Sequence, residues 1–148
     1  MQLPDWLIIL QVLSNCAIVA TFIIYWGQLK AMRDSSLAQN LISVNQFMLD
    51  PTFRDARMQL FVLSDNNQLS LTLTDDAQQV VDRVCASWNF VALLVDKKVL
   101  PFFVLEEAKY SFLKCHRICE PILTEVRKTR APDLWHHFTE YANKLSIE

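Results

Sequence analysis

The chain has 148 residues, with 14 Lys and Arg, 16 Asp and Glu, and a formal net charge of −2. A single glycine, Gly27, excludes a glycine-rich phosphate-binding loop. Four cysteines are too few for a disulfide scaffold in a chain of this length, and they fit a reducing compartment.

An uncharged apolar run covers Trp6 to Leu29, between Asp5 and Lys30. As a helix rising about 1.5 Å per residue, the run is long enough to cross a hydrocarbon layer about 30 Å thick. Trp6 at one end and Tyr25 and Trp26 at the other are typical interface anchors. The sequence therefore predicts a transmembrane helix over residues 6–29.

The charges that flank this run predict its orientation. Lys30 and Arg33 follow it directly, so the positive-inside rule places the N-terminus outside and the rest of the chain in the cytoplasm. A cleaved signal peptide is one alternative, but no Lys or Arg precedes the run. A lipoprotein box ending at Cys16 is another, but the apolar run continues well past that cysteine.

Polar residues recur within the run at alternating steps of three and four, which places them on one side of a helix. These candidate pore or helix–helix residues, here named the polar seam, are Gln11, Ser14, Asn15, Ile18, Thr21, Tyr25 and Gln28. The opposite side carries mostly small residues: Ala17, Ala20, Ile24, Gly27 and Ala31. Because unpaired amides are costly in hydrocarbon, we expect a homo-oligomer of four or more copies, in which the seam lines a water-filled path. The alternative is a simple lipid anchor whose polar residues have no role.

The remaining elements follow from periodicity and capping signals. Residues 30–49 are predicted to extend the membrane helix as a juxtamembrane segment, and residues 50–148 to form one cytoplasmic domain. Asp50 and Thr74 are predicted helix N-caps, with Pro51 at a first helical position. Residues 69–73 alternate but have no partner strand, so they are assigned to an extended loop.

Prolines divide the second half of the predicted domain. A helix is expected after Pro101, a kink or restart at Pro121, and a last helix opening at Pro132. The predicted fold is all-α, with a single N-terminal transmembrane helix continuing into a cytoplasmic bundle of about four to five helices.

Candidate catalytic and metal-binding residues are sparse. Cys115, His116 and Cys119 are close in sequence, but cysteines commonly fill helical cores, so neither a metal nor a cofactor is predicted. His136 and His137 are adjacent and point about 100° apart on a helix, so both are interpreted as ordinary surface or capping residues. Without a nucleophile–base arrangement, no catalytic residue is assigned and an enzyme is not expected.

Charge is distributed unevenly along the predicted domain. Residues 45–96 carry three basic and seven acidic side chains, a net charge of −4, whereas residues 97–130 carry eight basic and four acidic ones, a net charge of +4. The candidate ligand-binding residues are the clustered cations Lys114, Arg117, Arg127, Lys128 and Arg130. Their partner is an acidic surface of another subunit, anionic lipid headgroups, or a nucleotide or short nucleic acid.

Three short motifs follow the apolar run. They are Asp50-Pro51-Thr52-Phe53-Arg54-Asp55-Ala56-Arg57, then Trp88-Asn89-Phe90-Val91-Ala92 leading to Lys97-Lys98-Val99-Leu100-Pro101, and finally Leu134-Trp135-His136-His137-Phe138 after Arg127 and Arg130. This layout resembles a bacterial family of uncharacterised, membrane-tethered helical proteins classed as a domain of unknown function. The resemblance covers nearly the whole chain and implies no established reaction.

Two functions are therefore expected. The first is an oligomeric single-pass inner-membrane effector, a gated ion channel or membrane-disrupting protein, with a cytoplasmic domain that senses a ligand or partner protein. Small membrane-tethered helical effectors of this general kind act in bacterial anti-phage defence, which suggests that pathway by analogy. The alternative is a membrane-tethered scaffold or regulator that recruits a partner protein and conducts no ions.

Overall fold

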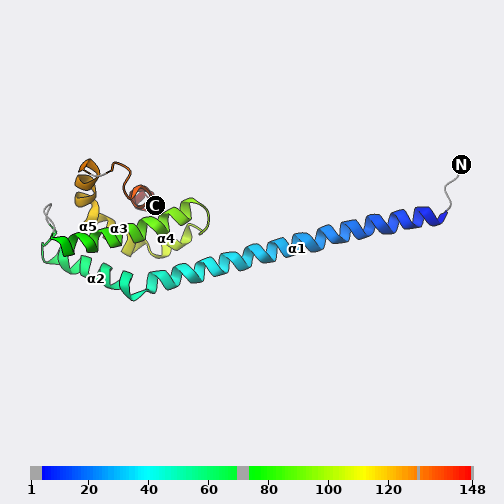
Figure 1. Ribbon diagram of the computed structural model, residues 1–148, viewed down its shortest axis with the longest axis horizontal. Helices are drawn as coiled ribbons and strands as arrows, with labels where there is room; N and C mark the ends of the chain where they lie inside the picture. The colour runs from blue at the N-terminus through cyan, green and yellow to red at the C-terminus, as the bar shows by residue number, and fades with distance from the viewer. Residues whose placement is uncertain (1–4, 70–73, 130, 148) are drawn as a thin grey trace. The chain divides into compact units, whose positions relative to one another are not determined.

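A computed structural model describes residues 5–69, 74–129 and 131–147. These residues form six α-helices and no strand, which confirms the predicted all-α class (Figure 1). In chain order the helices are α1 (Asp5–Leu49), α2 (Pro51–Asp65), α3 (Asp75–Asp96), α4 (Phe103–Glu107), α5 (Lys109–Thr129) and α6 (His136–Ile147).

Helix α1 continues without interruption through the predicted membrane segment and its predicted extension. No proline lies between Pro4 and Pro51, so nothing in this sequence breaks the helical hydrogen bonds. By length and composition, the helix over Trp6–Leu49 is long and apolar enough to cross a membrane. The chain divides into two compact units, one ending at Gln39 and one beginning at Asn40. The last turns of α1 therefore belong to the helical bundle, where Val44 is buried.

Both predicted N-caps are confirmed. The Oδ1 atom of Asp50 accepts hydrogen bonds from the backbone N–H groups of Thr52 (2.8 Å) and Phe53 (3.4 Å). The Oγ1 atom of Thr74 accepts one from the N–H of Ala77 at 3.4 Å. Each cap satisfies donors that have no partner inside their own helix, which starts α2 and α3 at these positions. Of the predicted loop 69–73, Leu69 has no regular structure, and residues 70–73 lie outside the described residues.

Helices α2 and α3 end in the same way. Beyond α2, Asn67 has φ 53°, and beyond α3, Lys98 has φ 57°. After each helix two backbone N–H groups turn back to the last carbonyls: Asn67 to Ser64 and Gln68 to Leu63, then Lys98 to Val95 and Val99 to Leu94. This is the Schellman arrangement, in which a left-handed residue reverses the chain. Neither position is a glycine, so both residues adopt a left-handed backbone conformation that costs free energy in the presence of a side chain.

The core of the bundle is organised around α3. This helix contacts α2, α5 and α6, and its Trp88 side chain is fully buried. Trp88 meets Phe53 of α2 and Phe112 of α5 edge to face, with ring centroids 5.3 and 5.0 Å apart. Phe112 in turn meets Phe138 of α6 at 4.9 Å. Edge-to-face pairs contribute about 0.5–1.5 kcal/mol each beyond buried area, so these rings join the four longest helices of the bundle.

Two helix starts differ from those expected. Of the kink or restart expected at Pro121, the restart is wrong, because α5 runs through this exposed proline; the break lies at Ala108, between α4 and α5. The last helix begins at His136 and not at Pro132, because Trp135 has φ 54° and cannot continue a right-handed helix backwards. The N–H of Phe138 is then bonded by Asn89 Oδ1 of α3 at 3.2 Å, a cap supplied from another helix.

Candidate functional site

The seven residues of the polar seam lie on α1 and are all exposed. Two sets repeat every seven residues, Gln11, Ile18 and Tyr25 in one and Ser14, Thr21 and Gln28 in the other. This is the spacing of the a and d positions of a heptad, which stay on one face when helices wind around each other in a left-handed supercoil. Asn15 extends this face beside Ser14.

A shallow groove runs along the seam. Its volume is about 350 Å³, and its lining residues are Ser14, Ala17, Ile18, Thr21, Phe22 and Tyr25. The Thr21 hydroxyl donates to the carbonyl oxygen of Ala17 at 2.8 Å, so its proton already has an acceptor within α1. Its oxygen can still accept a hydrogen bond from a partner.

The amides of Gln11 and Asn15 differ from the Thr21 hydroxyl in their hydrogen bonding. Within the described part of the chain, neither amide makes a hydrogen bond, and both residues are exposed. An amide that leaves water for hydrocarbon without a partner costs several kcal/mol, about 4–8 on the scale of transfer into cyclohexane. If α1 spans a membrane, these two groups need partners from outside this chain.

The opposite side of α1 is the second surface through which helices could associate. Its small residues include Gly27, where an added Cβ would meet no atom within 4 Å. Small residues let membrane helices approach closely, so this side competes with the polar seam as the interface. Ala17 of this side borders the groove along the seam, whereas Ala20 lies about 200° around the helix from Ile18, so a substitution at Ala20 distinguishes the two sides.

Arg127 is held inside the bundle. Its Nε atom donates to the carbonyl of Leu134 at 2.9 Å, and its Nη2 atom donates to the carbonyl of Trp135 at 3.2 Å and to Thr139 Oγ1 at 2.7 Å. Sequence position alone placed Arg127 with the candidate ligand-binding residues. The structure gives its guanidinium a structural role, which is to close the loop before α6.

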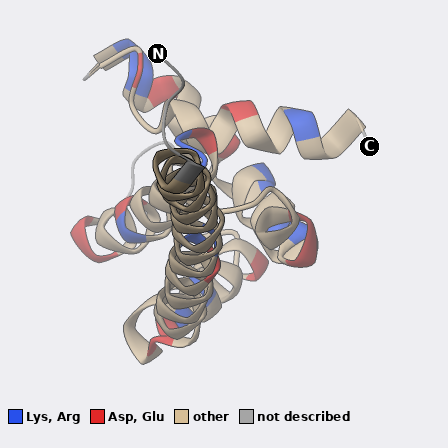
Figure 2. Ribbon diagram, turned by 90° about the vertical axis from the view of Figure 1, so that its right-hand side faces the viewer, with Lys and Arg blue, Asp and Glu red and all other residues tan. Residues whose placement is uncertain are grey.

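The other candidate ligand-binding residues differ in their surroundings. Lys114 Nζ lies 4.2 Å from the centre of the Phe61 ring, and Lys128 forms an exposed ion pair of 3.1 Å with Glu125. Arg117 is exposed, and Arg130 lies outside the described residues. Helical spacing places Lys114, Arg117 and Lys128 on one side of α5, away from Arg127. Figure 2 shows basic and acidic residues interspersed over the bundle helices.

The cysteines of the bundle are inert core residues. Cys85, Cys115 and Cys119 are buried, and Cys16 alone among the four is exposed. Burial raises the pKa of Cys115 to about 11, and hydrogen bonding with Cys119 together with burial raises the pKa of Cys85 well above its usual value. Burial also lowers the pKa of His116. Thiols with raised pKa values are poor nucleophiles at neutral pH.

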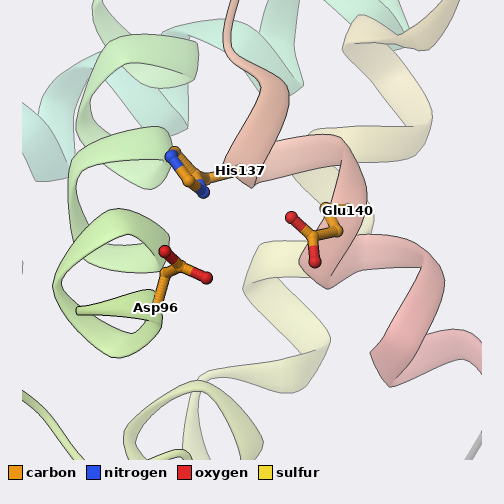
Figure 3. A group of neighbouring side chains, drawn as sticks. All are labelled: Asp96, His137 and Glu140. Atoms are coloured by element: carbon orange, nitrogen blue, oxygen red, sulfur yellow. The ribbon is translucent and has the colours of Figure 1, made fainter. Parts of the chain in front are cut away.

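One cluster was missed from the sequence. Asp96 of α3 lies beside His137 and Glu140 of α6, and one ligand atom from each residue lies within 4.8 Å of the other two (Figure 3). The i,i+3 spacing of His137 and Glu140 was visible in the sequence as a shared helix face. The third member was not, because nothing local indicates that the end of α3 packs against the start of α6.

An all-α bundle that follows a helix long and apolar enough to span a membrane defines the class of this protein. The sequence profile of a domain of unknown function, DUF4760, matches residues 15–145. The chain belongs to this uncharacterised family, as its sequence motifs indicated. No curated protein and no solved structure shows significant similarity. The matched region includes the seam from Asn15 onward and the bundle as far as Leu145.

Proposed function

We propose that this protein is a single-pass membrane effector whose α1 helices self-associate through the polar seam. The observation that carries the proposal is the pair of exposed amides of Gln11 and Asn15, unpaired within the described residues, in the uncharged apolar run of α1. A second copy of the chain is the partner, since its α1 presents the same two amides on the same face. Polar side chains that bond across helices stabilise membrane helix pairs by about 0.6–2 kcal/mol each.

The activity proposed for this assembly is ion conduction. In four or more copies the a and d side chains surround a central axis, and the uncharged polar groups of Ser14, Thr21 and Gln28 support a column of water there. Ile18 contributes one apolar ring between Ser14 and Thr21. A ring of this kind is a gate, because it loses its water when the helices move closer together.

The proposed orientation puts the N-terminus outside the bacterial inner membrane and the bundle in the cytoplasm. Support comes from Lys30 and Arg33, which follow the apolar run directly. Protease added to intact spheroplasts should leave the bundle uncut, and protease added to inverted vesicles should digest it. Cleavage of the bundle in intact spheroplasts would show that the bundle lies outside and would contradict the proposed orientation.

The bundle is the proposed sensor, with Lys114, Arg117 and Lys128 as contacts for an anionic ligand or an acidic partner protein. Arg127 is left out because its guanidinium is bonded within the bundle. Arg117→Glu should abolish gating, whereas Arg83→Glu, an exposed charge reversal on α3, should not. Equal gating by wild type and Arg117→Glu would remove Arg117 from the sensor.

Oxidative cross-linking in membranes tests which side of α1 forms the interface. Cys16 lies about 200° around the helix from Ile18, and the other three cysteines are buried. In a Cys16→Ser background, Ile18→Cys should form cross-linked dimers, and the native Cys16 should not. The opposite pattern would place the small-residue side at the interface and reject the seam.

Membrane depolarisation upon expression tests conduction separately from assembly. Gln11→Leu and Asn15→Leu should abolish depolarisation, and Ala20→Leu, which introduces the same side chain on the opposite side, should preserve it. Depolarisation that persists in both seam variants would reject the seam as a pore. An assembly that cross-links through Ile18→Cys but never depolarises the membrane would favour the scaffold function instead.

Bacterial anti-phage defence is the proposed pathway for the effector. Cells that express the wild-type chain should form fewer phage plaques than cells that express Asn15→Leu. Equal plaque counts across a broad phage panel would contradict a role in anti-phage defence. The depolarisation measurement would still decide whether the protein conducts ions.

A further inference from the structure

The cluster of Asp96, His137 and Glu140 lies where α3 ends and α6 begins. Asp96 is the last residue of α3, while His137 and Glu140 occupy one face of the first turns of α6. One carboxylate oxygen from each acid and one imidazole nitrogen lie within 4.8 Å of one another, and all three residues are half-buried. Figure 3 shows the His137 ring and the Glu140 carboxylate converging on Asp96 from the other helix.

One nitrogen of the His137 ring lacks a hydrogen-bond partner among the described residues. Its Nδ1 atom is buried and makes no hydrogen bond within the described part of the chain. A buried polar atom without a partner costs about 1–3 kcal/mol, so its presence calls for an explanation. Imidazole nitrogen is also the commonest protein ligand for transition metals.

The two carboxylates have neighbours that a bound ion must tolerate. Glu140 Oε1 accepts from Lys144 Nζ at 2.6 Å, Glu140 Oε2 lies 3.4 Å from His136 Nε2, and Asp96 Oδ2 lies 3.2 Å from Lys97 Nζ. The side chains of Lys144, His136 and Lys97 are 51–66% exposed. Exposed ion pairs of this kind contribute little, and each carboxylate has lone pairs for more than one partner.

The two carboxylates lie close together on neighbouring helices, since one oxygen of Asp96 and one of Glu140 are within 4.8 Å of each other. Two anionic oxygen ligands held close together repel each other, and a divalent cation between them removes that repulsion.

We infer that Asp96, His137 and Glu140 bind a divalent transition-metal ion, with Zn²⁺ the best match, and that water completes its coordination. One nitrogen and two carboxylate oxygens form a ligand set that Zn²⁺ accepts with three protein ligands and an open position. Mg²⁺ and Ca²⁺ prefer oxygen ligands alone. The ion would tie the end of α3 to the start of α6, beside the loop that Arg127 closes.

Zn²⁺ titration of the full chain in detergent tests this site directly. The background variant is Cys16→Ser, which removes the exposed thiol as a competing ligand. We expect one Zn²⁺ per chain and, at about 100 times the Kd, a Tm higher by about 10 °C. Mg²⁺ at the same concentration should leave the Tm unchanged.

Three substitutions and one matched control locate the ion. Asp96→Asn, His137→Gln and Glu140→Gln should each weaken Zn²⁺ binding by about 10-fold or more and abolish the rise in Tm. His136→Gln changes the exposed neighbouring histidine and should bind Zn²⁺ as the background does. Circular dichroism without metal should match the background; if His137→Gln fails this control, Glu140→Gln still decides the matter.

Cobalt spectroscopy identifies the ligand atoms. Co²⁺ at this site should show visible d–d bands without a sulfur-to-metal charge-transfer band, since no thiol takes part. The inference is overturned if the background chain binds no Zn²⁺ or if binding survives all three substitutions. A charge-transfer band from sulfur would overturn it as well, by moving the ion to the cysteines.

Discussion

The Nη2 atom of Arg127 donates a 2.7 Å hydrogen bond to Thr139 Oγ1, joining the last turn of α5 to the first turn of α6. The same guanidinium bonds the carbonyls of Leu134 and Trp135. The guanidinium thus donates to three acceptors and holds the loop before His136 in place. Trp135 has φ 54°, which a right-handed helix does not accommodate, and its carbonyl also accepts the N–H of Thr139 at 3.4 Å as α6 begins.

Arg127→Ala should therefore lower the free energy of unfolding by about 1–3 kcal/mol, because half-buried carbonyls lose charge-assisted donors. Chemical denaturation of the full chain in detergent measures the loss. Arg117→Ala, an exposed change on the same helix, should stay within about 0.5 kcal/mol of wild type. An unfolding curve for Arg127→Ala that overlays the wild-type curve would contradict this role.

Phe112 is the junction of the aromatic core, since its ring meets both Trp88 and Phe138. Phe112→Ala should cost about 3–5 kcal/mol and leave much of the bundle unfolded at 37 °C. Near-UV circular dichroism follows the loss of packed rings. The nearby Tyr110 is 79% exposed, so Tyr110→Ala should change stability by less than about 0.5 kcal/mol. Equal effects of the two substitutions would mean that Phe112 is not the junction.

Substitution by glycine should raise the free energy of unfolding at Lys98 and lower it at Lys97. Lys98 has φ 57°, so Lys98→Gly relieves a left-handed strain and should raise the free energy of unfolding by about 0.5–1 kcal/mol. Lys97 has φ −76°, so Lys97→Gly adds flexibility to the unfolded chain, removes an ion pair with Asp96 that contributes little, and should lower the free energy of unfolding by a similar amount. Thermal denaturation ranks the two variants, and the reverse order would rule out strain at Lys98.

Asp50 makes the stability of the bundle depend on pH. Hydrogen bonding to Thr52, with a further bond from Phe53, lowers the pKa of this carboxyl below 3.8. The ionised form is thus favoured in the folded state, and its contribution is full well above the unfolded pKa. That contribution is lost as the pH falls through the folded pKa.

Asp50→Asn keeps a capping oxygen but does not titrate. The Tm advantage of wild type over Asp50→Asn should accordingly be largest near pH 7 and shrink towards pH 2. Differential scanning calorimetry at several pH values follows the difference. A difference that stays constant from pH 7 to pH 2 would show that the charge of Asp50 does not stabilise α2.

Much of the fold was predictable because its signals are local. A run without charge between Asp5 and Lys30, and caps that bond within three residues of Asp50 and Thr74, each involve neighbours along the chain. The break between α4 and α5 at Ala108 was not predictable in the same way. Proline is the usual signal for such a break, but α5 continues through Pro121, which is exposed.

The candidate sites also differ in whether local sequence or tertiary packing reveals them. The polar seam was visible in the sequence because a heptad spacing becomes a shared helix face whatever surrounds the helix. The basic residues of α5 could not be told apart in the sequence, and packing separated them: Arg127 bonds the loop before α6, while Arg117 stays exposed.

By itself, the sequence determined an all-α chain with one helix suited to a membrane, since helical periodicity, caps and hydrocarbon thickness act over neighbouring residues. Only the tertiary structure decided where α6 begins, what Arg127 bonds, and that Asp96 meets His137 and Glu140. Each of these depends on residues far apart in the chain, whose contacts are set by how the helices pack around Trp88 and Phe112 and not by their neighbours in sequence.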